Sequence, residues 1–173
     1  MLLNTDLDDS SCTTLSRAAK RLAAAESVKE IVAILREHAR MIVGSDGIAV
    51  ILREGDSCHY VAEDAIEPLW RGQRFPMTAC VSGWAMLNNR SVIIPDLESD
   101  PRVPRESYAR TSMRTLAMVP FGTPEPIAAL GAYWCAYVEP EDSTIRRLEI
   151  LAQVAATAFA RVMAGSDAEA TVG

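Results

Sequence analysis

The sequence has few of the residues from which metal and catalytic centres are usually built. It contains two histidines and four cysteines, and the cysteines form no CxxC pair. Their wide separation predicts neither a zinc site nor a disulfide framework, so we expect reduced thiols and no metal site. There is also no G-x-S-x-G, P-loop or dinucleotide motif. We therefore expect a protein that is not an enzyme, and no cofactor can be named. The cysteines are Cys12, Cys58, Cys80 and Cys135.

The sequence also lacks an excess of positive charge and long apolar runs. Seventeen Lys and Arg residues stand against 23 Asp and Glu residues, giving a net charge of −6. Without a basic field to hold phosphate groups, nucleic acid is not an expected partner. No uninterrupted apolar run approaches the roughly 18 residues of a membrane span, and the amino end MLLNTDLDDSS is too acidic for a signal peptide. These absences predict a cytoplasmic protein without a membrane partner.

The chain has enough apolar material for a single core. It is 173 residues long and 49% hydrophobic, which suits one domain containing helices and a sheet. We place this α+β domain at residues 11–164. Residues 1–10, which carry three Asp and no apolar period, and the small polar residues 165–173 are predicted to be disordered tails.

Local patterns predict most of the first half of the domain. Apolar residues recur at helical spacing over 15–23 and again over 28–42. Ser27 and Glu30 form a capping-box signature for the second helix, and Gly44 ends it. The nearly continuous apolar run 47–53 predicts a central strand, followed by a turn at 54–56 and a returning strand at 57–62.

The stretch from 75 to 121 organises the rest of the chain. It predicts a short helix after Thr78, a buried strand at 91–95, a turn over 96–101, and a strand at 115–119. The polar connection between these two strands must cross one face of the sheet, so we expect it to form a lid over a pocket. Four arginines lie in or beside it, and they predict either an anionic ligand or ordinary pairing with Glu98, Asp100 and Glu106. These are Arg102, Arg105, Arg110 and Arg114.

The same stretch resembles the GAF family of sensory domains. The residues that carry the resemblance are Val81, Gly83, Ala85, Val92–Pro95, Asp96, Asp100, Pro101, Arg102 and Met118–Pro120, with 130–133 further on. The resemblance implies a GAF/PAS-like α+β fold. In it, a central antiparallel sheet of five to six strands carries the N- and C-terminal helices on one face. The short helix and the long lid lie on the other.

The resemblance also implies a ligand pocket between sheet and lid. The candidate ligand-binding residues are Trp84, Ile94, Asp96, Tyr108, Arg110, Met113, Met118, Tyr133 and Cys135. The ligand itself is an unidentified small molecule. Alternation along the strand 127–138 places Leu130, Ala132 and Trp134 on one face and Gly131, Tyr133 and Cys135 on the other. The pattern leaves open which face meets the lid.

The last helix, which begins near residue 140, predicts either self-association or a large internal contact. Leu148, Leu151, Ala155 and Phe159 form one apolar face, and Ile150, Val154 and Ala158 form another. A helix on a sheet needs only one such face, so the second predicts a homodimer through the first and last helices. The alternative is that the helices over 15–42 of the same chain cover it.

Two cysteines raise alternative functions. Cys58-His59 matches the dipeptide at which phytochrome-like relatives attach a bilin, but it precedes the expected position, and successive strand residues face opposite ways. Cys80 lies in the first turn of a helix, where the dipole lowers a thiol pKa, and relatives that reduce free methionine sulfoxide use cysteines near this helix. Ser82 occupies the position expected for such a cysteine, and no cysteine lies between Cys80 and Cys135.

These observations favour a sensory domain of a bacterial signal-transduction protein. The resemblance implies a histidine-kinase type of two-component protein, in which ligand binding under the lid alters dimerising helices and thereby a downstream kinase or other output domain. The alternatives are a dimerisation or interaction module without a ligand, and an enzyme similar to free methionine sulfoxide reductases. Cyclic nucleotides and haem are disfavoured because the matching motif and a histidine in the pocket are both missing.

Overall fold

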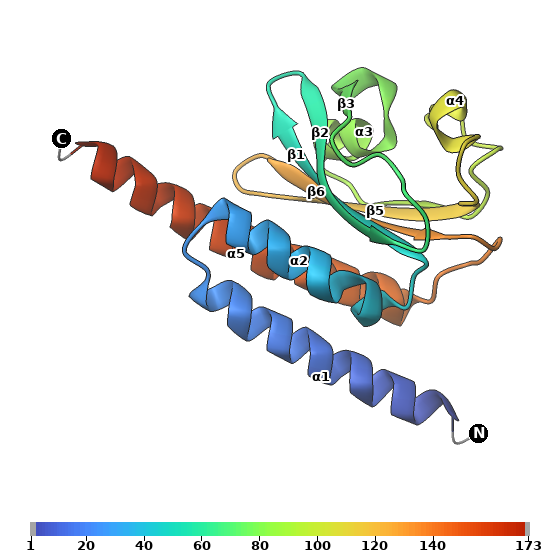
Figure 1. The fold of residues 1–173 in the computed structure, drawn as a ribbon, viewed down its shortest axis with the longest axis horizontal. Coiled ribbons are helices and arrows are strands. Elements are labelled where there is room, and N and C mark those ends of the chain that lie inside the picture. The colour runs from blue at the N-terminus through green and yellow to red at the C-terminus, as the bar shows by residue number, and fades with distance from the viewer. Residues whose placement is uncertain (1–2, 172–173) are drawn as a thin grey trace.

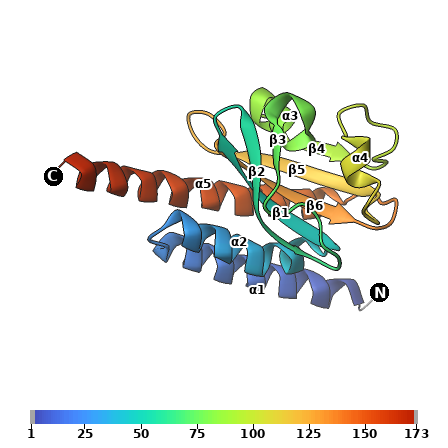
Figure 2. The ribbon, with the colours of Figure 1, turned by 45° about the horizontal axis from the view of Figure 1, so that its top comes forward.

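A computed structural model describes residues 3–171 and shows a sheet between two layers (Figure 1). One layer holds the long helices α2 (Val28–Val43) and α5 (Asp142–Thr171), and α1 (Leu3–Ala24) packs on their outer side, away from the sheet. The other holds the short helices η1 (Met77–Ala79), α3 (Val81–Asn88) and α4 (Arg105–Tyr108). The predicted α+β architecture is confirmed, including the separation of long and short helices onto opposite faces (Figure 2).

The sheet is antiparallel and has six strands. These are β1 (Gly47–Glu54), β2 (Ser57–Ala65), β3 (Arg74–Pro76), β4 (Val92–Ile94), β5 (Thr115–Phe121) and β6 (Ala128–Trp134), and their spatial order is β3-β2-β1-β6-β5-β4. The hairpin predicted around residues 54–56 joins β1 to β2, and β1 lies at the centre, paired with β2 and β6. Its nearly continuous apolar sequence follows from this position, because both of its faces are covered.

Local signals set the ends of α2 as predicted. The Ser27 hydroxyl accepts a hydrogen bond from the Glu30 backbone N–H at 3.1 Å, and Gly44 ends the helix with a left-handed backbone at φ +65°. The predicted cap of the next short helix differs. Residues 77–79 form the separate helix η1, and Cys80, not Thr78, is the N-cap of α3.

One extra residue in β2 changes which face its side chains meet. Val50 of β1 is opposite Ala62, and the next residue, Ile51, is opposite Tyr60, so Val61 is a bulge residue without a counterpart. Cys58 and Tyr60 therefore face the short helices, whereas Ala62 faces the long ones. Regular alternation would have kept all three on one side.

Each face of the sheet has its own core. The helix core consists of aliphatic residues from α1, α2, α5 and the helix-facing strand positions, with Phe121 and Phe159 as its aromatic pair, their ring centroids 5.7 Å apart. The lid core lies under α3, α4 and the loops and contains Tyr60, Trp70 and Tyr133. On β6, Leu130 belongs to the helix core and Tyr133 to the lid core, which decides the face that the sequence left open.

The structure differs from the prediction at both ends of the chain. Residues 3–10 are helical within α1, and residues 165–171 continue α5, where disordered tails were expected. Residues 1–2 and 172–173 lie outside the described part of the chain. The domain limits 11–164 stay a prediction.

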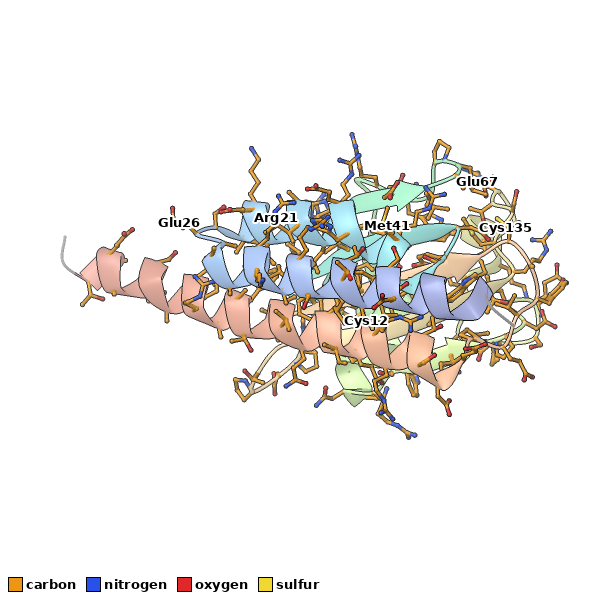
Figure 3. All side chains as sticks on the ribbon, turned by 90° about the horizontal axis from the view of Figure 1, so that it is seen from below. Cys12, Arg21, Glu26, Met41, Glu67 and Cys135 are labelled. Carbon is orange, nitrogen blue, oxygen red and sulfur yellow. The ribbon has the colours of Figure 1, made fainter. Side chains whose placement is uncertain are left out.

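The second apolar face of α5 is partly covered within the chain. Viewed from the helix side, α1 lies across α2 and α5 (Figure 3). The Arg161 guanidinium donates to the carbonyl oxygens of Leu22 and Ala25 at 2.9 and 2.7 Å and so ties α5 to the end of α1. Ala158 is buried, but Ile150 remains 43% exposed. This arrangement agrees with the internal contact that the sequence offered as the alternative to a dimer.

Candidate functional site

The candidate site is built from the lid segment, residues 96–114, where it crosses the end of the sheet. Pro104 stands at the N-cap of α4, whose Tyr108 ring packs on Trp70 with centroids 4.6 Å apart. Trp70 in turn contacts Tyr133 of β6 at 5.3 Å, and its indole N–H donates to the Ser107 carbonyl at 3.2 Å. The space directly beneath Tyr108 is therefore filled by aromatic side chains.

A pocket lies beside this aromatic stack instead of beneath it. It has a volume of about 380 Å³ and is lined by Leu97, Glu98, Val103, Arg105, Tyr108, Ala109, Met113 and Arg114. Ligand sites in proteins usually enclose about 300–1,000 Å³, so this volume suits a small molecule. The pocket thus lies at the edge of the lid segment, whereas the sequence predicted it between lid and sheet. We call it the α4 pocket.

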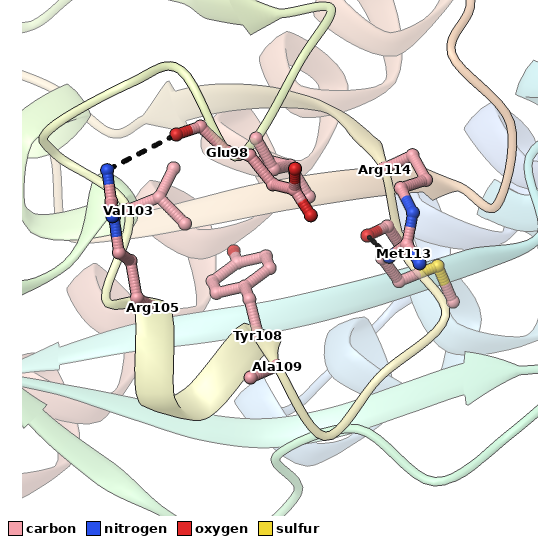
Figure 4. Close-up of a pocket in the computed structure, with 8 residues that line it drawn as sticks. Glu98, Val103, Arg105, Tyr108, Ala109, Met113 and Arg114 are labelled. Atoms are coloured by element: carbon pink, nitrogen blue, oxygen red, sulfur yellow. Dashed lines mark hydrogen bonds between the residues drawn. The ribbon is translucent and has the colours of Figure 1, made fainter.

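Two arginines flank the α4 pocket, with Tyr108 between them (Figure 4). Arg105 donates to the Glu98 carbonyl oxygen at 3.5 Å, and Arg114 donates to the Met113 carbonyl oxygen at 3.1 Å. Within residues 3–171, neither forms an ion pair. The one carboxylate among the lining residues is Glu98. The pocket therefore offers two guanidinium groups to an anion, above an apolar wall that includes Val103 and Met113.

The other two arginines of the cluster have different roles. Arg102 forms a two-point ion pair with Asp100 at 2.9 and 2.6 Å, and its guanidinium carbon lies 4.5 Å from the ring centre of Trp84. The hydrogen bond from Arg102 lowers the pKa of Asp100. Arg102 thus braces the turn through Asp100, one of the pairings that the sequence predicts. Arg110 is exposed and lines a separate hollow of about 180 Å³ beside Trp70.

The predicted site residues divide into three groups. Tyr108 and Met113 line the α4 pocket. Ile94, Met118 and Tyr133 are buried in the lid core and do not line it, because aromatic side chains fill the space above the sheet. The remaining four, Trp84, Asp96, Arg110 and Cys135, lie around the site without lining the α4 pocket. Sequence reasoning named the arginine cluster but did not select Arg105 and Arg114.

Two of these outlying residues have structural partners. The Asp96 carboxylate accepts a hydrogen bond from the Glu98 N–H at 3.0 Å and so shapes the turn. Cys135 is half-buried, its backbone N–H donates to the Asp46 carboxylate at 2.7 Å, and its sulfur lies 3.8 Å from that of Met113. The lid segment is also held by Glu67, whose carboxylate accepts from the backbone N–H and hydroxyl of Ser112 at 2.5 and 3.1 Å.

One hydroxyl deep in the lid core has no partner. Tyr133 is completely buried, and its OH is the one buried side-chain N or O atom without a hydrogen bond among the described residues. Burial raises its pKa, so the phenol is neutral. The ring folds back over Gly131, where an added Cβ would lie 2.7 Å from the Tyr133 oxygen. An unsatisfied buried hydroxyl costs about 1–3 kcal/mol.

A pair of thiols lies in the same core under η1. Cys58 of β2 is fully buried, and its thiol interacts with that of Cys80, the N-cap of α3. The hydrogen bond from Cys58 lowers the pKa of Cys80 to about 6, helped by hydrogen bonds from Ser82 and from the Gly83 backbone. The predicted depression of the Cys80 pKa is thus supported. Its proximity to Cys58 was missed, because 22 residues separate them.

Comparison with known proteins decides the family. The family model described as GAF domain matches residues 25–160. The chain belongs to the GAF domain family. GAF domains are typically sensory or regulatory, and the predicted relationship and fold are confirmed. Among curated proteins, none matches this chain.

Solved structures share the fold at low sequence identity. The free methionine-R-sulfoxide reductase from Neisseria meningitidis, solved with its substrate, is 18% identical with a TM-score of 0.75, and the match covers 90% of this chain and 91% of that one. The GAF domain of a phosphoenolpyruvate-protein phosphotransferase from Acinetobacter is 12% identical with a TM-score of 0.76, covering 91% and 97%. The chromophore-binding domain of a bacteriophytochrome from R. palustris is 17% identical with a TM-score of 0.73, covering 88% and 62%.

Two further observations concern metal ligands and membrane-length helices. Within residues 3–171, no three His, Cys, Asp or Glu side chains are grouped as metal ligands. Among the described helices, α5 is long and apolar enough to cross a membrane by length and composition. Its buried residues, which include Leu148, Leu151 and Phe159, belong to the helix core, although only 33% of its apolar window is buried. GAF domains are typically soluble.

Proposed function

We propose that this GAF domain is a sensory module that binds a small anionic molecule in the α4 pocket. The observation that carries the proposal is the pair Arg105 and Arg114, which flank an apolar pocket and donate only to backbone carbonyl oxygens. Guanidinium groups bind carboxylates and phosphates through charge-assisted hydrogen bonds. A ligand with one anionic group and a small apolar body suits the chemistry and the 380 Å³ volume.

Strand β5 connects the α4 pocket to the long helices, so ligand binding can alter their packing. Arg114 immediately precedes β5, and its backbone N–H donates to the Trp134 carbonyl oxygen of β6 at 2.8 Å. At the other end of β5, Phe121 packs against Phe159 of α5. A ligand that prefers one position of Arg114 shifts the population of β5 positions and thereby the packing of α5.

The output in this proposal is a kinase of the two-component type in the cytoplasm. The fold neighbours include domains of a bacteriophytochrome and a phosphotransferase, which supports a regulatory role. The end of α5 extends beyond the sheet and is exposed from residue 163 to 171, so an output domain can contact it (Figure 1). Fusing α5 in continuous helical register to a histidine-kinase core, and measuring autophosphorylation with and without a bound anion, tests this output.

Ligand binding is tested by a thermal-shift screen with small dicarboxylates, sugar phosphates and nucleotides. We expect at least one anion to raise the melting temperature of the unsubstituted domain, and the shift to disappear in Arg105→Ala and Arg114→Ala. Arg146→Ala is the matched control, because Arg146 is exposed on α5 away from the pocket. Equal shifts in all three variants, or no shift with any anion, would contradict the proposal.

The homodimer remains part of the proposal, through α1 and α5. The exposed apolar side chains that a second copy would cover include Ile150 and Met163 on α5, which are 43% and 50% exposed. Sedimentation velocity of the full chain is the test. A chain that is monomeric at all concentrations would contradict the homodimer. The second apolar face of α5 would then serve only the internal contact with α1.

A second function, reduction of free methionine sulfoxide, is favoured by one observation. The reductase from Neisseria meningitidis shares the fold, and Cys80 has a depressed pKa beside a second thiol. We nevertheless propose a regulatory domain, because Ser82 occupies the position at which the resemblance places a reductase cysteine. Turnover of free methionine-R-sulfoxide with dithiothreitol, abolished in Cys80→Ser, would establish the enzyme instead.

A further inference from the structure

Three elements bring the thiols of Cys58 and Cys80 together. The antiparallel pairing of β2 with β3 places Cys58 opposite Phe75 and Ser57 opposite Pro76. The chain then turns through η1, and the sulfur of Cys80 lies 3.5 Å from the Pro76 carbonyl oxygen. The sulfur of Cys58 lies 3.2 Å from that of Met77, directly after Pro76. The two thiols therefore lie against adjacent residues of the β3–η1 connection, Cys58 against Met77 and Cys80 against Pro76.

Polar groups around the pair favour one thiolate over the other. The Ser82 hydroxyl lies 3.3 Å from the Cys80 sulfur and 3.1 Å from the Tyr60 hydroxyl. The hydrogen bond from Cys58 lowers the pKa of Cys80 to about 6, and the Ser82 hydroxyl and the Gly83 backbone N–H at the start of α3 contribute to this lowering. The hydrogen bond with the Cys80 sulfur, and then burial, raise the pKa of Cys58. Cys80 is the nucleophile of the pair and Cys58 is its neutral partner.

We propose that Cys58 and Cys80 are a reversible redox site that forms a disulfide in the folded domain. The oxidant we assign is a small hydroperoxide, because Cys80 is 4% exposed and Cys58 is fully buried. The proposal is independent of ligand binding in the α4 pocket, which is lined by neither cysteine.

The chemistry balances with these two thiols and one hydroperoxide. The Cys80 thiolate attacks the terminal oxygen of the hydroperoxide R–O–OH, the O–O bond breaks, and ROH leaves after taking up a proton; ROH is an alcohol for an organic hydroperoxide and water for hydrogen peroxide. Cys80 is then a sulfenic acid. The sulfur of Cys58 attacks the Cys80 sulfur, the S–O bond breaks, and water leaves with the proton of Cys58. Two electrons pass from the thiols to the hydroperoxide, and an external dithiol returns them.

A disulfide at this place would change the lid side of the domain. It would link β2 covalently to the start of α3, which otherwise contacts the sheet through packing and hydrogen bonds. Ser82 and Tyr60 lie beside the bond, and Tyr60 packs edge-on against Trp70 at 5.8 Å. Oxidation therefore acts on the same aromatic core that supports Tyr108 and the lid segment.

The test uses hydrogen peroxide on the full, folded chain, followed by alkylation in denaturant and peptide mapping. Cleavage after Lys and Arg places the four cysteines in four different peptides, with Cys58 in residues 54–71 and Cys80 in residues 75–90. We expect these two peptides to be joined, with a mass lower by two hydrogens, and to separate after dithiothreitol. This test uses the unsubstituted chain, so it does not depend on whether a variant folds.

Two variants separate the roles of the thiols. In Cys58→Ser, the reaction should stop at a Cys80 sulfenic acid that dimedone labels, whereas Cys80→Ser should leave Cys58 unreacted. Cys135→Ser and Cys12→Ser are the controls and should not change the 58–80 link. Met77→Leu controls for oxidation of the neighbouring thioether, which occurs in the same peptide as Cys80.

The outcomes that overturn the proposal are specific. Peroxide that links only Cys12 between molecules, or that converts Cys80 to sulfinic acid in the unsubstituted chain without any 58–80 link, would show that the thiols are not a redox pair. A link that forms equally fast in denaturant would show that the fold does not promote it. Loss of anion binding in the α4 pocket would leave the 58–80 result unaffected.

Discussion

The two faces of the sheet bury their side chains against very different neighbours. On β6, Leu130 and Ala132 join the aliphatic helix core, whereas Tyr133, next along the strand, joins Trp70 and Tyr108 in the lid core. The helix core holds no polar atom in need of a partner among its buried side chains. The lid core contains hydroxyls, thiols and an unsatisfied phenol. One face therefore stabilises the domain, while the other carries the groups that can bind or react.

This contrast predicts that the largest loss of stability comes from the helix core. Leu148 of α5 is completely buried in it, so Leu148→Ala should lower the free energy of unfolding by about 3–4 kcal/mol, because a cavity remains where the side chain was. Urea unfolding measures the loss. Ile150→Ala on the same helix is the control, because Ile150 is 43% exposed and should cost under about 1 kcal/mol. Similar losses in both would mean that the two helix faces are buried alike.

The second prediction concerns the close approach of α3 and η1 on the lid face. A Cβ added to Gly83 would lie 1.9 Å from the Met77 carbonyl oxygen, a backbone atom that cannot rotate away. We expect Gly83→Ala to cost about 3 kcal/mol in urea unfolding, the upper part of the usual overpacking range. Gly165→Ala is the matched control, because nothing lies within 4 Å of that position on α5. Gly165→Ala should stabilise the domain by about 0.5–1 kcal/mol. A loss of stability in this variant would mean that the helix surface around residue 165 is not open.

The third prediction uses two tyrosines of the lid core that differ in one hydrogen bond. Tyr133→Phe removes a buried hydroxyl without a partner and should raise the free energy of unfolding by about 1 kcal/mol. Tyr60→Phe removes the hydrogen bond with Ser82 at 3.1 Å and should lower it by about 1 kcal/mol. Opposite signs in urea unfolding would support the assignment. A loss in both variants would indicate that Tyr133 has a partner in solution.

The smallest effect is expected from the ion pair at the rim of the lid. The hydrogen bond with Arg102 is the main cause that lowers the folded-state pKa of Asp100. The stability that the ionised Asp100 contributes is therefore fully present above its unfolded pKa of about 3.9. That contribution is lost as pH falls through the lower folded-state pKa. Asp100→Asn should therefore cost under about 1 kcal/mol at pH 7 and nothing below the folded pKa. Urea unfolding at pH 7 and at a series of decreasing pH values measures both. A cost of Asp100→Asn that does not decline as pH falls would mean that hydrogen-bond geometry, and not charge, carries the effect.

Local signals in the sequence predicted most of the fold. The capping residue Ser27, the left-handed Gly44 and the apolar run of β1 act within a few residues of themselves, so they can be recognised without the rest of the chain. The resemblance supplied the layer order. The tails were less predictable, because continuing an existing helix requires no apolar period of its own.

The candidate site was less predictable because it depends on tertiary packing. Nothing in the local sequence around Trp70 indicates that it fills the space under Tyr108 and moves the pocket to the side. Likewise, the pairing of Cys58 and Cys80 depends on the register of β2 with β3 and on the turn through η1. These are contacts between segments, and a local pattern cannot encode them.

Because Val61 has no partner in β1, the two halves of β2 contribute side chains to different cores. The first half places Cys58 and Tyr60 in the lid core, and the second half places Ala62 in the helix core. If β2 paired with β1 without this bulge, Cys58 would lie opposite Glu54 and face the long helices, away from Cys80. The reactive chemistry of this domain and the irregularity of one strand must therefore be inherited together.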